Sequence, residues 1–123
     1  MAEGKFATSV SCMDGRIQLP LANWIKEKYS VDFVDAITEP GVDKTVAENS
    51  DLESIKFKVG ISINAHKSEL IVISGHSDCA GNPVSDDEHI SQIKKGVEVI
   101  SSWNTGAKVI GVWVDNSWTV NVI

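Results

Sequence analysis

The sequence predicts an α/β fold in which helices flank one open, mostly parallel sheet. Short segments rich in β-branched residues alternate along the chain with longer segments whose apolar residues recur at helical spacing. Residues 70–73 form a continuous apolar run, which is typical of a parallel strand that is covered on both faces. We therefore expect a four-stranded, mostly parallel sheet with a C-terminal antiparallel hairpin strand.

The first half of the chain is predicted to contain two strands and two helices. Residues 6–10 and residues 31–37 carry β-forming residues and predict the first and second strands. Between them Pro20 suits the first turn of a helix, where its missing N–H costs nothing, and apolar residues follow at helical spacing up to Tyr29. A helical pattern then extends from residue 46 to residue 65, after a Pro-Gly loop.

The second half is predicted to contain one helix between strands. Residues 69–74 predict the third strand, and Ser85 with Glu88 forms a capping box that starts the helix after it. Residues 109–114 predict the fourth strand. Residues 118–123 predict a last strand, which pairs with the fourth as a hairpin after a short polar turn.

Length and composition indicate one ordinary globular domain. The 123 residues suffice for one domain with a core but not for two, so we expect a single domain over residues 1–123. The net charge of −6 argues against binding of nucleic acid, which requires clustered lysines and arginines. The apolar runs are shorter than a membrane span, so we expect no membrane association.

The chemistry of the two cysteines depends on the compartment. The N-terminal residues do not form the pattern of a signal peptide, so the reducing cytoplasm is the expected location. In that compartment cysteines serve as metal ligands or free thiols more often than as a disulfide.

Two short motifs contain both cysteines of the chain and one of its three histidines. Residues 11–16 follow the first predicted strand, and residues 75–81 follow the third. If these strands are neighbours and the second strand lies on the other side of the first, the strand order reverses between them, where such sheets bind ligands. Cys12, His76 and Cys79 then meet at one edge. Two thiolates and an imidazole suit zinc, and they leave a fourth position free, as in a catalytic zinc site.

Simpler interpretations of these residues stay open at this point. Cys12 and Cys79 could be two buried free thiols. A purely structural zinc could take Asp14 as its fourth ligand, or Asp14 and Arg16 could be an ordinary local ion pair. Asp78 is expected to cap the loop or to contact a ligand rather than to bind metal.

The two motifs together resemble those of the β-class carbonic anhydrases. Cys12-x-Asp14-x-Arg16 is followed, after a long gap and a hydrophobic strand, by His76-x-x-Cys79. The resemblance implies that Cys12, His76 and Cys79 bind Zn²⁺ and that Asp14 and Arg16 form a catalytic dyad beside the metal. It also implies a zinc lyase that hydrates carbon dioxide reversibly to bicarbonate, and assembly as a homodimer or higher homo-oligomer.

The chain departs from the family in ways that bear on substrate. Gly15 stands where the family usually has serine, and residues 39–42 stand where it usually has an Ala-Gly-Asn stretch. The alternatives are therefore hydrolysis of a related small molecule, such as carbon disulfide or carbonyl sulfide, or a non-catalytic zinc-binding domain.

The expected mechanism requires a carboxylate held beside the metal. Zinc lowers the pKa of a bound water from about 15.7 to about 7. Arg16 can hold Asp14 through two hydrogen bonds, so that Asp14 accepts a proton from this water. In the alternative state Asp14 takes the fourth position on the metal and closes the site.

Overall fold

The computed structural model describes residues 3–123, and within them nine helices and strands alternate as an α/β chain. In chain order these elements are β1 (Phe6–Ser11), α1 (Gly15–Tyr29), β2 (Phe33–Thr38), α2 (Val42–Glu48), α3 (Glu53–Asn64), β3 (Leu70–His76), α4 (Asp86–Ser101), β4 (Lys108–Val114) and β5 (Val120–Val122). None of the helices in this described part is long and apolar enough to cross a membrane.

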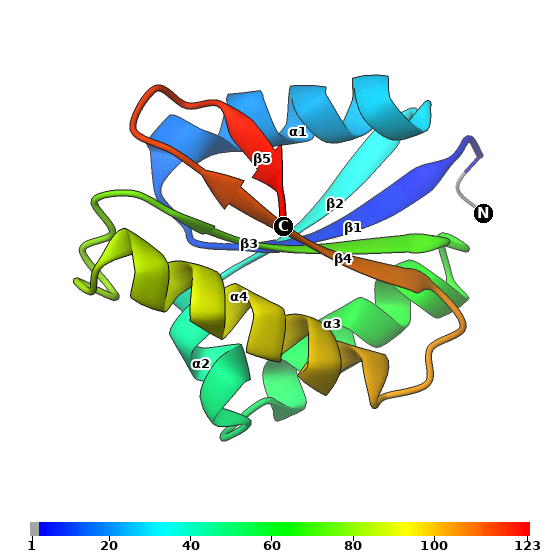
Figure 1. Cartoon of the computed structure of the whole chain (residues 1–123). Coiled ribbons are helices and arrows are strands. Elements are labelled where there is room, and N and C mark those ends of the chain that lie inside the picture. The colour runs from blue at the N-terminus through cyan, green and yellow to red at the C-terminus, as the bar shows by residue number, and fades with distance from the viewer. Residues whose placement is uncertain (1–2) are drawn as a thin grey trace.

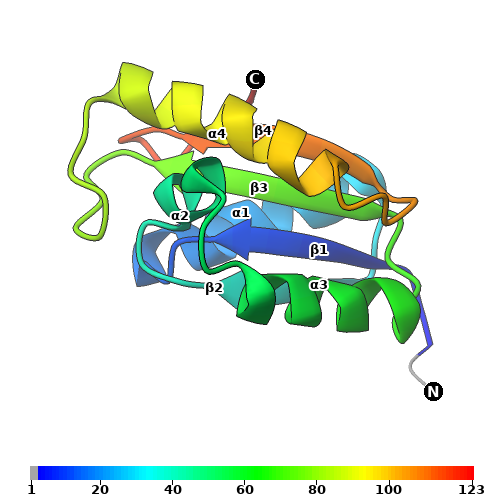
Figure 2. The ribbon, with the colours of Figure 1, turned by 90° about the horizontal axis from the view of Figure 1, so that it is seen from below.

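The strands form one sheet in the order β2-β1-β3-β4-β5. β1 pairs in parallel with both β2 and β3, β3 pairs in parallel with β4, and β5 runs antiparallel to β4. Helix α1 covers one face of this sheet, while α2, α3 and α4 cover the other (Figure 1). The view from below shows α3 and α4 lying across the second face, with α2 beside α4 (Figure 2). The predicted fold class is confirmed.

Two hydrophobic cores lie on the two faces, and β3 contributes to both. All seven residues of β3 are buried. Ile71 and Ile73 pack into the core under α2, α3 and α4, whereas Leu70 and Val72 pack into the core under α1. Because successive side chains point to opposite faces, a strand covered on both sides needs a continuous apolar run.

Two helix boundaries differ from the prediction. Pro20 lies inside α1, which begins at Gly15, so its assignment to the first turn was wrong. The Asp14 side chain caps this earlier start by accepting a hydrogen bond from the backbone N–H of Arg16. The predicted helix over residues 46–65 is in fact two helices. Asn49, at a left-handed φ of 53°, ends α2, and Asp51, at a left-handed φ of 56°, lies in the break before α3.

The topology places the candidate site at one edge of the sheet. In the parallel pairing of β1 with β3, Thr8 lies opposite Ile71 and Val10 lies opposite Ile73. The carboxyl ends of the two strands therefore emerge side by side, and β2 and β3 lie on opposite sides of β1. This is the reversal of strand order at which ligands bind in open α/β sheets.

The buried face of β3 predicts a large stability difference between two substitutions. Ile73→Ala should lower the free energy of unfolding by about 2–5 kcal/mol, because Ile73 is fully buried and its loss leaves a cavity. Phe57→Ala is the control, since Phe57 is 70% exposed and its removal should change stability by about 0.5 kcal/mol or less. Urea denaturation measures both, and equal losses would contradict the assignment of the core.

Candidate metal centre

Three side chains from the two motifs meet beyond the ends of β1 and β3. Cys12 follows the last residue of β1, His76 is the last residue of β3, and Cys79 lies in the turn that follows. All three are buried, and one potential ligand atom from each lies within 4.8 Å of the others. The structure thus brings together the three residues that the sequence predicted as metal ligands.

The separation of the two sulfur atoms fits a shared metal ion. Cys12 Sγ and Cys79 Sγ lie 3.8 Å apart, and both cysteines are free. A disulfide needs about 2.05 Å. Two sulfurs bound to a tetrahedral zinc at about 2.3 Å each are about 3.8 Å apart.

His76 presents one ring nitrogen for ligation. Its Nδ1 donates a hydrogen bond of 2.8 Å to the backbone carbonyl of Ser77, so Nε2 carries the lone pair in the neutral ring. Nε2 is buried and has no hydrogen-bond partner among residues 3–123. A buried nitrogen acceptor without a partner is costly unless a ligand occupies it. This arrangement is that of a metal-binding histidine whose second nitrogen is fixed by a backbone carbonyl.

The surroundings of Cys79 favour its neutral thiol. Burial, followed by the neighbouring sulfur of Cys12, raises the pKa of the Cys79 thiol to about 11. The nearby backbone N–H groups of Gly81 and Asn82 act in the opposite direction and lower this pKa. The backbone N–H of Gly41 donates to Cys12 Sγ over 3.5 Å. Metal binding to such thiols displaces their protons, so the donor set fits zinc.

Asp14 and Arg16 form an ion pair beside the cluster. Arg16 Nη2 lies 2.7 Å from Asp14 Oδ2, and Arg16 Nε donates to Asp14 Oδ1 over 3.0 Å. The side-chain hydrogen bonds from Arg16, together with its backbone N–H, lower the pKa of Asp14 to about 2. Asp14 is therefore ionised at neutral pH, and its Oδ2 lies 3.9 Å from His76 Nε2.

Arg16 is held from its other side as well. Its Nη1 lies 3.2 Å from Asp78 Oδ2, and its Nη2 donates to the Asp78 carbonyl over 3.0 Å. Its guanidinium also lies 5.1 Å from the ring centre of Trp118. These contacts hold the plane of the guanidinium, and the bonds to Asp14 and Asp78 raise the pKa of Arg16 further. Asp78 thus contacts the dyad rather than the ligand cluster.

The sequence did not indicate the roles of Gln18 and Trp118. Gln18 Nε2 donates to the carbonyls of Cys12 and Asp14, in each case over 2.9 Å, and so ties the first motif to α1. Gln18 lies four residues after Asp14, a spacing that brings two residues to the same face of a helix, and this spacing could have indicated the contact. Trp118 approaches Arg16 from the turn between β4 and β5, for which the sequence contains no local signal.

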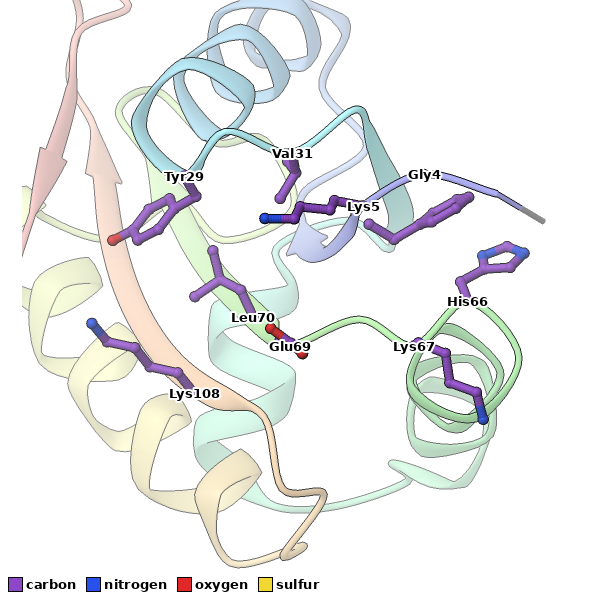
Figure 3. A pocket seen from close by; sticks show the side chains of 10 residues that line it. Gly4, Lys5, Tyr29, Val31, His66, Lys67, Glu69, Leu70 and Lys108 are labelled. Atoms are coloured by element: carbon purple, nitrogen blue, oxygen red, sulfur yellow. The ribbon is translucent and has the colours of Figure 1, made fainter.

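A separate cavity lies at the opposite edge of the sheet. It has a volume of about 440 Å³ and is lined by residues at the start of β1 and β3, including Phe6 and Leu70. Figure 3 shows Lys5, Tyr29 and Lys108 around it. His66 in this cavity makes a hydrogen bond of 2.7 Å to Asp35 and stacks on Phe6, so this histidine is remote from the metal-ligand cluster.

Comparisons with known proteins identify relatives of the sequence and of the fold. The sequence matches, over residues 2–123, the profile of a family described as "Putative carbonic anhydrase". No curated protein matches the sequence significantly.

Solved structures share the fold at low sequence identity. The β-carbonic anhydrase isoform I of Trichomonas vaginalis superposes with a TM-score of 0.68 and 17% identity, over 94% of this chain and 81% of that one. A carbonic anhydrase from Streptococcus mutans superposes with a TM-score of 0.66 and 11% identity, over 94% and 80% of the two chains. The β-carbonic anhydrase of Aspergillus fumigatus superposes with a TM-score of 0.57 and 13% identity, over 97% of this chain and 74% of that one.

The cluster geometry predicts that zinc stabilises the protein through His76. Zinc at about 100 times its dissociation constant should add about 2.7 kcal/mol to the free energy of unfolding and raise the melting temperature. His76→Ala should abolish this zinc-dependent shift, because it removes one of three ligands. His66→Ala should retain it, since His66 lies at the opposite edge. Thermal unfolding and metal analysis measure both effects, and stoichiometric zinc at wild-type affinity in His76→Ala would show that His76 is not a ligand.

Proposed function

The chain belongs to the carbonic anhydrase family, and from this premise we propose that it is a zinc-dependent lyase that hydrates carbon dioxide reversibly to bicarbonate. The observation that carries the proposal is the buried group of two thiols and one imidazole next to an ionised carboxylate. Cys12, His76 and Cys79 are the proposed zinc ligands, and Asp14 with Arg16 is the proposed catalytic dyad. This assignment uses each polar side chain that the resemblance singles out in the two motifs.

Zinc bound by these three residues would act as a Lewis acid and lower the pKa of water toward neutrality. The residues of the chain then have two tasks. The thiols must give up their protons to bind the ion, and His76 must keep its Nε2 free, which its hydrogen bond to Ser77 ensures. Three protein ligands leave one position for the reacting water.

Asp14 is the proposed group that orients this water and accepts its proton. Its carboxylate lies next to the ligand cluster and is ionised, because Arg16 lowers its pKa to about 2. Side-chain hydrogen bonds from Arg16 engage both oxygens of the Asp14 carboxylate, which opposes its use as a metal ligand. This orientation supports the open, catalytic form of the site over the form in which Asp14 is the fourth ligand.

We also propose that the protein works as a homodimer or higher homo-oligomer in the cytoplasm. Met13 and Leu19 lie close in sequence to the dyad and are 61% and 72% exposed, so they supply apolar surface beside the site. Two free thiols at 3.8 Å are maintained in a reducing compartment, which supports the cytoplasmic location.

The proposed activity predicts carbon dioxide hydration that depends on zinc and on Cys12. Zinc-loaded wild type should hydrate carbon dioxide well above the Cys12→Ser variant, which removes a thiolate ligand. Stopped-flow detection of the released proton measures this, with metal content determined on the same samples. Parallel assays with carbon disulfide and carbonyl sulfide test the related substrates. If only carbon disulfide or carbonyl sulfide is turned over, that gas replaces carbon dioxide as the proposed substrate. If no gas is turned over faster than by Cys12→Ser, the result favours a non-catalytic zinc domain.

The dyad predicts that Arg16 affects turnover but not metal binding. Arg16→Ala should keep zinc bound while hydration falls by roughly 10²-fold, the lower end of the contribution of a positioned acid or base. Without Arg16, Asp14 loses its three side-chain hydrogen bonds and can approach the metal. Lys26→Ala, which removes an exposed cation from the last turn of the same helix, is the control. Unchanged turnover in Arg16→Ala would remove the dyad from the mechanism.

A further inference from the structure

Asp43 forms a buried polar network behind the proposed zinc site, and the mechanism above does not use it. Asp43 near the start of α2 and His89 in α4 are 2% and 1% exposed. His89 Nδ1 donates to Asp43 Oδ2 over 2.6 Å, because a carboxylate oxygen can only accept. Asn82, in the loop after Cys79, donates from Nδ2 to Asp43 Oδ1 over 3.1 Å. Three separate segments of the chain thus meet at one carboxylate.

Two loops that carry the network are packed backbone against backbone. A Cβ atom added to Gly41 would lie 2.7 Å from the carbonyl oxygen of Gly81. A Cβ atom added to Gly81 would lie 2.8 Å from the carbonyl carbon of Pro40. Gly41 also has a φ of +57°, which residues other than glycine rarely adopt. The backbones of the two loops therefore lie so close together that a side chain at Gly41 or Gly81 would clash with the opposite loop.

The same two loops supply N–H groups to both cysteines of the cluster. Gly41 N–H donates to Cys12 Sγ over 3.5 Å, and Asn82 N–H donates to the backbone carbonyl of Cys79 over 3.3 Å. The first bond withdraws charge from a Cys12 thiolate and so stabilises the form of the cysteine that binds metal. The second bond holds the turn that carries Cys79.

Asp43 connects these loops at the residues next to the donors. It follows Gly41 by two positions, and its partner Asn82 directly follows Gly81. Its carboxylate also lies against the residue before the histidine ligand, since a Cβ on Gly75 would lie 2.5 Å from Asp43 Oδ2. The network thus contacts the segments of His76 and Cys79 and is linked to Cys12 through Gly41, while His89 attaches it to α4.

We propose that Asp43, together with Asn82 and His89, is a positioning residue. It holds the loop of Gly41 against the loop of Gly81 and thereby sets the affinity of the site for zinc. The inference rests on the proposed zinc site and concerns side chains that touch neither metal nor substrate. It requires that Asp43 act through Gly41 and Asn82, so its loss must change the sulfur environment as well as the stability of the fold.

The experiment compares zinc affinity in Asp43→Asn, Asn82→Ala and the wild type. Asp43→Asn keeps the shape of the side chain but removes one acceptor, and Asn82→Ala removes the hydrogen bond between the loops. Competition with a chromophoric chelator should show zinc binding that is about 10–100-fold weaker in both variants, as is typical when a partner of metal ligands is lost. Co²⁺ bound in place of zinc should show an altered thiolate-to-metal charge-transfer band, because the Gly41 N–H that donates to Cys12 Sγ and the turn that carries Cys79 have moved.

Glu48→Gln is the matched control for the loss of charge. Glu48 lies in the same helix and makes a surface ion pair of 3.9 Å with Lys44. The substitution should leave zinc affinity and the Co²⁺ spectrum at wild-type values. Asn82→Ala decides the question if Asp43→Asn does not fold.

The outcomes separate this inference from the proposed function. Variants that melt at lower temperature but keep wild-type zinc affinity and the wild-type Co²⁺ spectrum would show a purely structural network and overturn the inference. A wild type that binds zinc but hydrates no carbon dioxide would overturn the proposed activity, and weaker zinc binding in the variants would still support the positioning role.

Discussion

Parallel pairing of β1 with β3 is the constraint on which the rest of the site depends. The hydrogen-bond ladder sets Thr8 opposite Ile71 and Val10 opposite Ile73, so the ends of the two strands leave the sheet at the same edge. β3 is buried on both faces because α1 covers one face of the sheet and α2, α3 and α4 cover the other. Two cysteines that are 67 positions apart come within 3.8 Å only because this ladder exists.

The site combines a buried part and an exposed part with different electrostatics. The thiols and His76 are buried, and burial raises the pKa of Cys79 to about 11, so this thiol favours its neutral form until a cation is present. The ion pair of Asp14 and Arg16 lies at the surface, where Arg16 lowers the pKa of Asp14 to about 2. Asp14 also caps α1, so one carboxylate both starts the helix and faces the cluster. The start of α1 and the position of the dyad are therefore set by the same side chain.

The order of the elements could be predicted from the sequence because it depends on local patterns. The apolar run of β3 and the capping box at Ser85 are properties of a few neighbouring residues, and both elements are present. The break after α2 could not be predicted. The left-handed conformations of Asn49 and Asp51 allow α2 to pack on α4 while α3 packs elsewhere on the same face, and this preference arises only between elements. The position of Pro20 within α1 has a local origin instead, since the cap at Asp14, which accepts from the Arg16 N–H, starts the helix before Pro20.

The sequence by itself determined the alternation of strands and helices and the chemical identity of the candidate metal-ligating set. Both depend on side-chain type and on the spacing of apolar residues, which are local properties of the chain. The tertiary structure alone decided which groups support that set. Trp118 reaches Arg16, and Asp43 reaches Asn82 and His89, through contacts between residues far apart in the chain. Such contacts leave no local pattern, since their free energy depends on the distance between packed elements and on the exclusion of water around them.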